Sequence, residues 1–240
     1  SIEAEQLKTR GMVNGNVLVP TPQERTPLTG DPRAASLIRR FLRAFPDLAP
    51  NRTEIDPRAL NTNSPQLINQ DRLLGRWDLS LGGDRKLWTQ YQYQNQFVDA
   101  FQLVAGQNPD TTLASQQARI TWAQPFAGSG VWTLGAAFDR VRTALSPEPN
   151  AVGPFVRFSR MIESLGPRSE VPIDRIENTF RGGAQLAWAS GAHRLTAGAE
   201  FARHQLNGRE SRDHRGHFNF SYNFGRTAVE NFILGRETIR

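Results

Sequence analysis

Four side chains near the end of the chain could do metal chemistry. Asp213, His214 and His217 share one polar stretch, and His204 precedes them. Imidazole nitrogens and carboxylates bind divalent transition metals. Their spacing fits no defined zinc pattern, however, and histidines in polar loops are usually solvated. We therefore predict no metal and no other cofactor.

Candidate catalytic carboxylates are equally sparse. Glu148 and Glu163 lie in one long loop and have the chemistry of a glycosidase acid pair, but nothing in the sequence fixes their separation. The chain has no phosphate-cradling glycine loop and no nucleophile elbow. It has no cysteine, which excludes disulfides and thiolate sites. The sequence therefore favours a protein that is not an enzyme.

The positive charge of the chain comes almost wholly from arginine. Lys8 and Lys86 are the only lysines among 29 basic residues, and the formal net charge is +6. The arginines form no basic stripe and belong to no recognition module, so we predict no nucleic-acid partner. Four of them flank one expected outer loop, where a solvated role is favoured over contact with lipid phosphates or an anionic ligand. These are Arg203, Arg209, Arg212 and Arg215.

The elements that carry these side chains show strand periodicity. In residues 73–81, for example, Leu73, Trp77 and Leu79 alternate with polar residues. Successive side chains of a strand point to opposite faces, so one face of each such segment is apolar and the other is polar. Trp88, on the glutamine side of its segment, is an exception. Seven segments are predicted as strands: 73–81, 87–97, 114–122, 132–138, 180–188, 195–201 and 218–224.

The connections between these segments alternate in length. Short turns rich in Gly, Ser and Asp occupy 81–86, 126–130 and 189–193, whereas longer polar stretches occupy 105–112, 146–175 and 207–216. Short turns at one end and long loops at the other are typical of an outer-membrane barrel. A soluble sandwich would share the period of two and stays open as the alternative.

We therefore predict an all-β fold: an antiparallel, up-and-down transmembrane β-barrel, seen in part, located in the outer membrane of a Gram-negative cell. The apolar faces would contact outer-membrane lipid. The polar faces would line the lumen. The predicted lumen-facing residues are Gln90, Gln92, Gln94, Arg119, Arg181, Gln185 and Glu200.

Residues 1–66 are predicted to form an irregular segment that precedes the barrel wall of residues 67–240. Within it, Asp31 and Pro32 predict the start of a short amphipathic helix over about 32–45, which Pro46 ends. Its apolar face comprises Ala34, Leu37, Ile38, Phe41, Leu42 and Phe45. A basic helix of this kind can lie on a membrane, but packing against its own loop or the barrel rim is favoured.

Several stretches resemble the barrel region of large TonB-dependent receptors, in particular the Oar-like subgroup with an N-terminal carboxypeptidase-regulatory-like domain. The similarity covers NVLVPTPQERTPLTGDPRAASLIRRFLRAFPDLAPNRTEIDPRALNTNSPQ, NTFRGGAQLAWASGAHRLTAGAEFARHQLNGRE and HFNFSYNFGRTAVENFILGR. Phe218-Asn-Phe220 followed by Asn231-Phe-Ile-Leu-Gly235 is similar to an aromatic strand, a short helix-like segment and an FLLG-type motif. The resemblance implies an energised transporter with a plug domain and a TonB-type energising complex as partners, of which this chain would be an internal barrel fragment.

In that interpretation the chain supplies wall and outer loops for uptake of a large or scarce ligand. The loop Ser146 to Arg175 is the predicted ligand contact, because long loops on a rigid scaffold carry recognition. Its candidate residues are Phe155, Arg157, Phe158 and Arg160. The alternatives are a passive porin-like or structural outer-membrane protein, and a soluble carbohydrate-binding β-sandwich.

Overall fold

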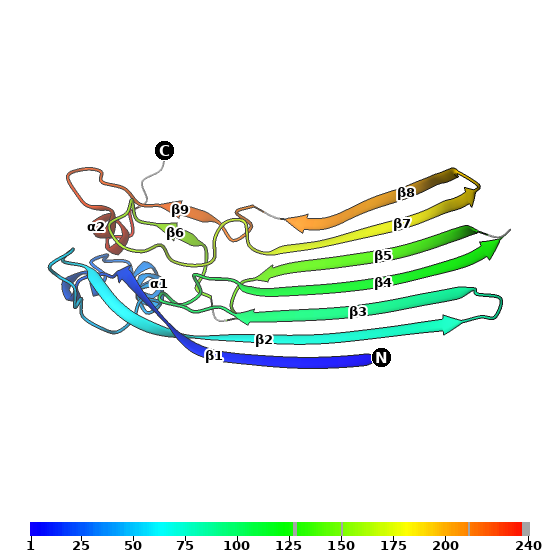
Figure 1. Ribbon diagram of the computed structural model, residues 1–240. Coiled ribbons are helices and arrows are strands. Elements are labelled where there is room, and N and C mark those ends of the chain that lie inside the picture. The colour runs from blue at the N-terminus through cyan, green and yellow to red at the C-terminus, as the bar shows by residue number, and fades with distance from the viewer. Residues whose placement is uncertain (127–128, 150, 211, 237–240) are drawn as a thin grey trace.

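A computed structural model describes residues 1–126, 129–149, 151–210 and 212–236, and its main element is one long, curved sheet (Figure 1). Seven antiparallel strands form this sheet in the order β1-β2-β3-β4-β5-β7-β8, with β1 and β8 at its edges. Their bounds are Ile2–Leu18 (β1), Ala59–Ser80 (β2), Lys86–Asp99 (β3), Asp110–Phe126 (β4), Gly130–Ser146 (β5), Ile173–Ser190 (β7) and His193–Glu210 (β8). The predicted all-β, antiparallel up-and-down architecture is thus confirmed.

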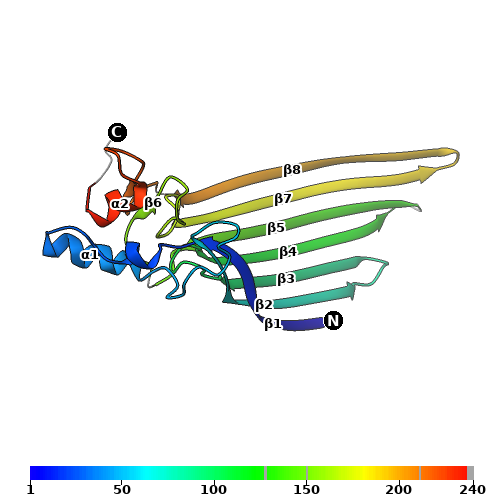
Figure 2. The ribbon, with the colours of Figure 1, turned by 90° about the vertical axis from the view of Figure 1, so that its left-hand side faces the viewer.

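The connections differ sharply between the two ends of the sheet. At one end β2–β3 and β7–β8 are joined by tight turns, and Gly82, Gly83, Asp84 and Gly191 adopt the positive φ that such turns require. The predicted turn 126–130 joins β4 to β5, although its residues 127 and 128 lie outside the described residues. All long connections gather at the other end (Figure 2). The predicted alternation of short and long connections is therefore present.

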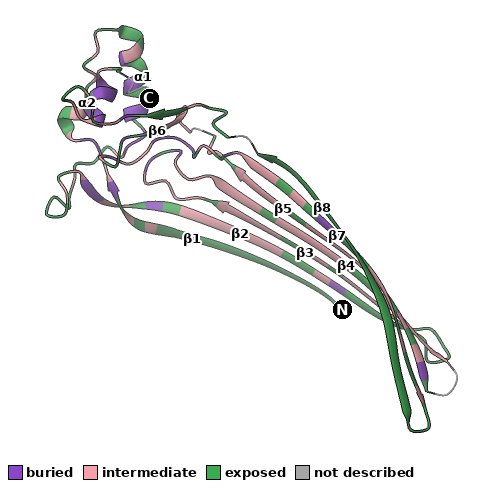
Figure 3. Ribbon diagram, turned by 90° about the horizontal axis from the view of Figure 1, so that it is seen from above, coloured by how far each residue is buried: buried purple, intermediate pink, exposed green. Residues whose placement is uncertain are grey.

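The long connections and the segment that follows β8 fold together into a compact unit, which we call the cap. It contains α1 (Pro32–Leu42), α2 (Ala228–Ile233), the 3-10 helix Pro22–Arg25 (η1), and a parallel pair of short strands, β6 (Phe155–Arg157) and β9 (His217–Asn219). Nearly all fully buried side chains of the described chain lie here, whereas the strands are mostly exposed or half-buried (Figure 3). The centre of the cap is aromatic: Phe158 and Phe220 both pack edge-on against Phe232, at centroid distances of 5.1 and 5.2 Å.

Helix α1 starts as its sequence predicts. The Asp31 side chain accepts a hydrogen bond from the Arg33 backbone N–H at 3.0 Å, and Pro32 occupies the first turn. The helix buries Ala35, Ile38, Phe41 and Leu42 in the cap, so it packs against its own loops. Leu37, predicted on the apolar face, is instead 51% exposed. None of the described helices has the length and apolarity needed to cross a membrane.

Two sequence expectations are wrong. Residues 2–18, expected to be irregular, form β1, which pairs with β2 along its whole length. Segment 218–224, expected to be a wall strand, is extended only at β9 and then turns back, with positive φ at Phe224 and Gly225. The side chain of Asn231 holds this reversal by donating to the Ser221 carbonyl at 3.0 Å. The alternating aromatic residues of 218–224 therefore belong to the cap, where Phe220 is buried.

Candidate functional site

The strand register divides the sheet into an apolar face and a polar face. On the apolar face, Trp122 of β4 is opposite Leu134 of β5, and Phe138 of β5 is opposite Phe180 of β7. On the polar face, Gln90 of β3 is opposite Arg119 of β4. Because no register slip interrupts the ladders, parity alone assigns every strand residue to one face.

The apolar face is apolar only over the half of the sheet next to the short turns. On β7 this apolar band runs from Trp188 to Phe180, a span of about 27 Å at about 3.4 Å per residue. Because strands of membrane barrels tilt by about 35–45°, this length corresponds to a height of about 19–22 Å, compared with the roughly 25 Å apolar belt of such barrels. Beyond it, toward the cap, the same face carries polar side chains such as Asn178 and Asp174.

Aromatic side chains mark both limits of the band. The limit next to the turns includes Trp122, Trp132 and Trp188, and the limit next to the cap includes Tyr93, Phe138, Phe180 and Phe201. Neither limit follows one row of paired residues across the sheet. The cap-side limit lies at the pair Leu73–Tyr93 on β2 and β3, but at Phe201 on β8, which is opposite Gly182. Paired aromatic girdles are a feature of transmembrane barrels.

No other part of the described chain covers the band. Phe180 and Trp132 are each 43% exposed, and Phe201 is 68% exposed. A β-sandwich would bury these side chains between two sheets. The seven-stranded sheet of the described chain therefore does not form a β-sandwich.

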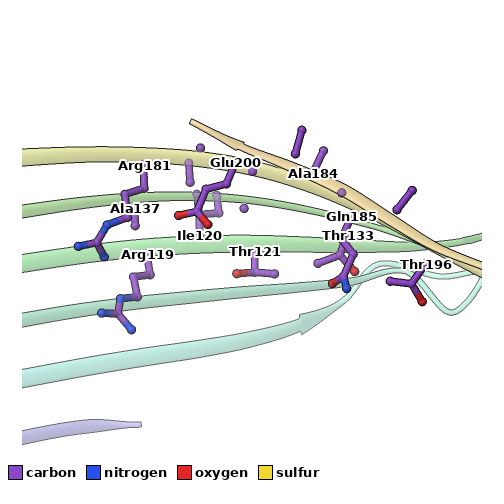
Figure 4. Close-up of a pocket in the computed structure, with 17 residues that line it drawn as sticks. Arg119, Ile120, Thr121, Thr133, Ala137, Arg181, Ala184, Gln185, Thr196 and Glu200 are labelled. Atoms are coloured by element: carbon purple, nitrogen blue, oxygen red, sulfur yellow. The ribbon is translucent and has the colours of Figure 1, made fainter. Parts of the chain in front are cut away.

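The polar face brings together all seven residues that were predicted to face a lumen. Gln90, Gln92 and Gln94 follow one another on β3, and Arg119 lies on the neighbouring β4. The close-up in Figure 4 shows Arg119 and Arg181 on the same side of the sheet as Gln185 and Glu200. An open hollow of the sheet lies there, lined in part by these four side chains and by Thr121, Thr133 and Thr196.

Two contacts on this face were not foreseen. Arg181 forms an ion pair with Asp139 at 3.3 Å, and Thr179 Oγ1 lies 3.1 Å from His204 Nδ1. The alternation of side chains along β5, β7 and β8 places these four residues on the polar face. Which of them pair depends on the strand register, which could not be predicted from the sequence.

The cap lies over the polar-face side of the sheet where β1 ends and β2 begins. The backbone N–H of Gln102 donates to Ser64 Oγ at 2.8 Å, and Leu103 packs where a side chain on Gly15 would point. Ser64 and Gly15 both belong to the polar face by parity. Loop 100–109 thus folds inward over this face and joins it to the cap, because Ala105 N–H also donates to the Ala44 carbonyl at 2.8 Å.

The predicted ligand-contact residues lie in three different places. Phe155 and Arg157 line a polar pocket of the cap, together with Phe101, Gln107, Asn108 and Arg168 among others. Phe158 is 1% exposed and belongs to the aromatic centre of the cap, so its role is structural. Arg160 is exposed, with a φ of 67°, and lies outside the described pockets. The alternation of the sequence could not reveal which phenylalanine is buried, because 155–158 is not a wall strand.

A second pocket of the cap is mainly apolar. Phe41, Phe218 and Phe232 line it, and Arg40 and Arg215 are also among its lining residues. The exposed side chain of Leu37 also contributes to its wall.

The candidate catalytic carboxylates hydrogen-bond to adjacent residues of loop 100–109, and the candidate metal residues make separate contacts. Glu163 accepts a hydrogen bond from Gln107 at 2.8 Å, whereas Glu148 accepts one from the Gly106 backbone N–H at 3.1 Å. Burial raises the pKa of Glu148, and the nearby Asp110 and Asp99 add to this. His217 lies 3.6 Å from Asp213, whereas His204 contacts Thr179 on the sheet. Within the described ranges, no three His, Cys, Asp or Glu side chains group as a metal site.

Comparison with known proteins supplies the family. Neither the comparison with curated proteins nor that with solved structures gave a match. The family described as "Outer membrane beta barrel domain" matches residues 6–239. That range covers nearly the whole chain, including the banded sheet and the cap. The chain therefore belongs to this outer-membrane β-barrel family.

Proposed function

We propose that the chain forms wall and outer loops of an energised, TonB-dependent receptor that takes up a large or scarce ligand. Membership of the outer-membrane family supports contact between the apolar band and lipid. In this proposal the polar face lines the interior, and a plug domain hydrogen-bonds to groups such as Gln92 and Glu200. The resemblance of the cap segments to TonB-dependent receptors supports the energised mechanism.

One observation carries this proposal: the cap is folded over the polar face. Because loop 100–109 is fixed to Ser64 and to the Ala44 carbonyl, a molecule entering from the loop end meets the cap before it meets the polar face. A structural barrel has no need for a folded unit at that position. An uptake receptor uses such a unit to select its ligand.

The polar pocket around Phe155 and Arg157 is the proposed site of first contact. It combines aromatic rings with guanidinium and carboxamide donors, the mixture that orients a ligand in a pocket. Phe158 belongs to the aromatic centre of the cap and does not line this pocket. Replacing Arg157 by Ala should impair uptake, whereas Arg160→Ala, outside the pocket, should leave uptake unchanged.

Conductance of the complete protein in a planar bilayer tests the proposed class. A receptor with a plug stays closed without its energising complex, so no steady current should flow in KCl solution. Uptake in cells should also stop when an uncoupler dissipates the proton gradient. Steady porin-like conductance, with uptake that survives the uncoupler, would establish the passive alternative instead.

A further inference from the structure

The apolar face changes from apolar to basic where the band ends on the cap side. On β5, Phe138 is followed on the same face by Arg140 and Arg142, and on β8 Phe201 is followed by Arg203. Within the band itself, this face carries no charged residue on β4, β5, β7 or β8. The guanidinium groups therefore begin within one or two same-face positions of the aromatic limit.

Register brings two of these arginines to neighbouring positions. Arg140 of β5 is opposite Asn178 of β7, and Arg203 of β8 is opposite Phe180 of β7. Asn178 and Phe180 are two residues apart on β7. One strand lies between the two arginines and their positions differ by two residues along it, so their backbones are about 12 Å apart, at about 4.8 Å per strand and about 3.4 Å per residue. Long arginine side chains can span much of that distance and meet at one ligand.

The three arginines differ in the number of hydrogen bonds that they form within the described chain. Arg142 forms two hydrogen bonds with Asp174, at 3.1 and 2.9 Å. Arg140 donates to the Asn178 carboxamide at 3.3 Å, which fixes one nitrogen of its guanidinium and leaves its other donors open. Arg203 makes no hydrogen bond or ion pair with any residue of the described ranges. Arg140 and Arg203 can therefore accept an external anion.

We propose that Arg140 and Arg203 bind the phosphate of a phosphorylated glycolipid in the outer leaflet. Short turns of outer-membrane barrels lie on the periplasmic side, so the cap side of the band is the outer surface. There the acyl chains of a lipid lie against Phe138, Phe180 and Phe201 while its headgroup reaches the arginines. Guanidinium groups pair with phosphate through parallel hydrogen bonds.

The test compares lipid binding by the wild-type protein and by an Arg140→Gln/Arg203→Gln double variant. Both are purified in mild detergent, and the retained phosphoglycolipid is quantified by mass spectrometry. We expect about ten-fold less lipid on the double variant, because two charge-assisted hydrogen-bonding groups are lost. A matched variant, Lys86→Gln/Arg194→Gln, removes the same charge at the short-turn end of the polar face and should retain lipid as the wild type does.

A second measurement needs no variant. The thermal midpoint of the wild-type protein is recorded with added phosphorylated glycolipid, with its dephosphorylated form, and with inorganic phosphate. The phosphorylated lipid should raise the midpoint most, since only it supplies both acyl chains and phosphate. Equal effects of the two lipids, an equal effect of inorganic phosphate, or unchanged lipid retention by the double variant would each overturn the proposal.

Discussion

Phe138 and Phe180 lie directly opposite each other on β5 and β7, with ring centroids 5.0 Å apart. The next same-face pair toward the cap is Arg140 and Asn178, which are joined by a hydrogen bond. One step of the ladder thus passes from an aromatic pair to a polar pair. This step marks the cap-side limit of the apolar band on β5 and β7.

A charge placed in the band should be far more harmful than the same charge one residue away. Ala136 lies on the apolar face, and Ala137 lies on the polar face between Arg119 and Arg181. We expect Ala136→Asp to destabilise the barrel by about 2 kcal/mol, since a carboxylate in hydrocarbon is poorly solvated. Ala137→Asp should be neutral or stabilising. Urea unfolding in lipid vesicles measures the difference, and equal effects would contradict the assignment of faces.

Single cysteines can map the two faces, because the natural chain has none. Thr133→Cys lies on the polar face, and Leu134→Cys lies in the band. A bilayer-dissolved quencher should reduce the fluorescence of a label at position 134, whereas an aqueous quencher should act at position 133. The pattern should repeat with Ala137→Cys and Phe138→Cys. If aqueous quenching were the same at all four positions, the band would not lie in lipid.

The cap should depend strongly on Phe158 and only weakly on Phe155. Phe158 packs against Phe220 and Phe232 at the aromatic centre, whereas Phe155 is half-buried beside His217. Phe158→Ala should therefore cost about 3–5 kcal/mol of cap stability by creating a cavity. Limited proteolysis of the cap reports this loss, and Phe155→Ala is the control. Similar cleavage of the two variants would show that Phe158 is not a core residue.

The strands of the wall could be predicted from the sequence only in part. The alternation of Leu73, Trp77 and Leu79 reveals β2 inside the band, but β2 begins 14 residues before Leu73, at Ala59. There the outer face is polar, so alternation disappears although the strand continues. The same reason explains β1, of which only Ile2 and Ala4 face the band.

The candidate site was predictable where it depends on parity and not where it depends on tertiary packing. Gln92, Arg119 and Glu200 share a face because strand side chains alternate. The burial of Phe158 follows instead from contacts with Phe220 and Phe232, more than 60 residues along the chain. Alternating aromatics in 218–224 misled the prediction, since a buried cap segment and a wall strand can present the same pattern.

The pH dependence of cap stability should involve Glu148. Burial raises the pKa of this carboxyl, so folding favours its protonated form. Its contribution to the free energy of unfolding is therefore fully present below the unfolded pKa of 4.5 and is lost as pH rises through the higher folded pKa. Glu148→Gln keeps an acceptor for the Gly106 N–H and removes the ionisation. We expect the variant to gain stability over the wild type as pH rises from 4 to 7, measured as the difference in thermal midpoints. A constant difference over this range would contradict the prediction.

The two limits of the apolar band shift in the same direction across the sheet, by two same-face positions between Tyr93 on β3 and Phe201 on β8 on the cap side. Since a bilayer is level, the strands must lean within it. Residues joined across a ladder are consequently at unequal depths. A contour of constant depth runs diagonally over the wall, crossing from Leu73 to Phe201.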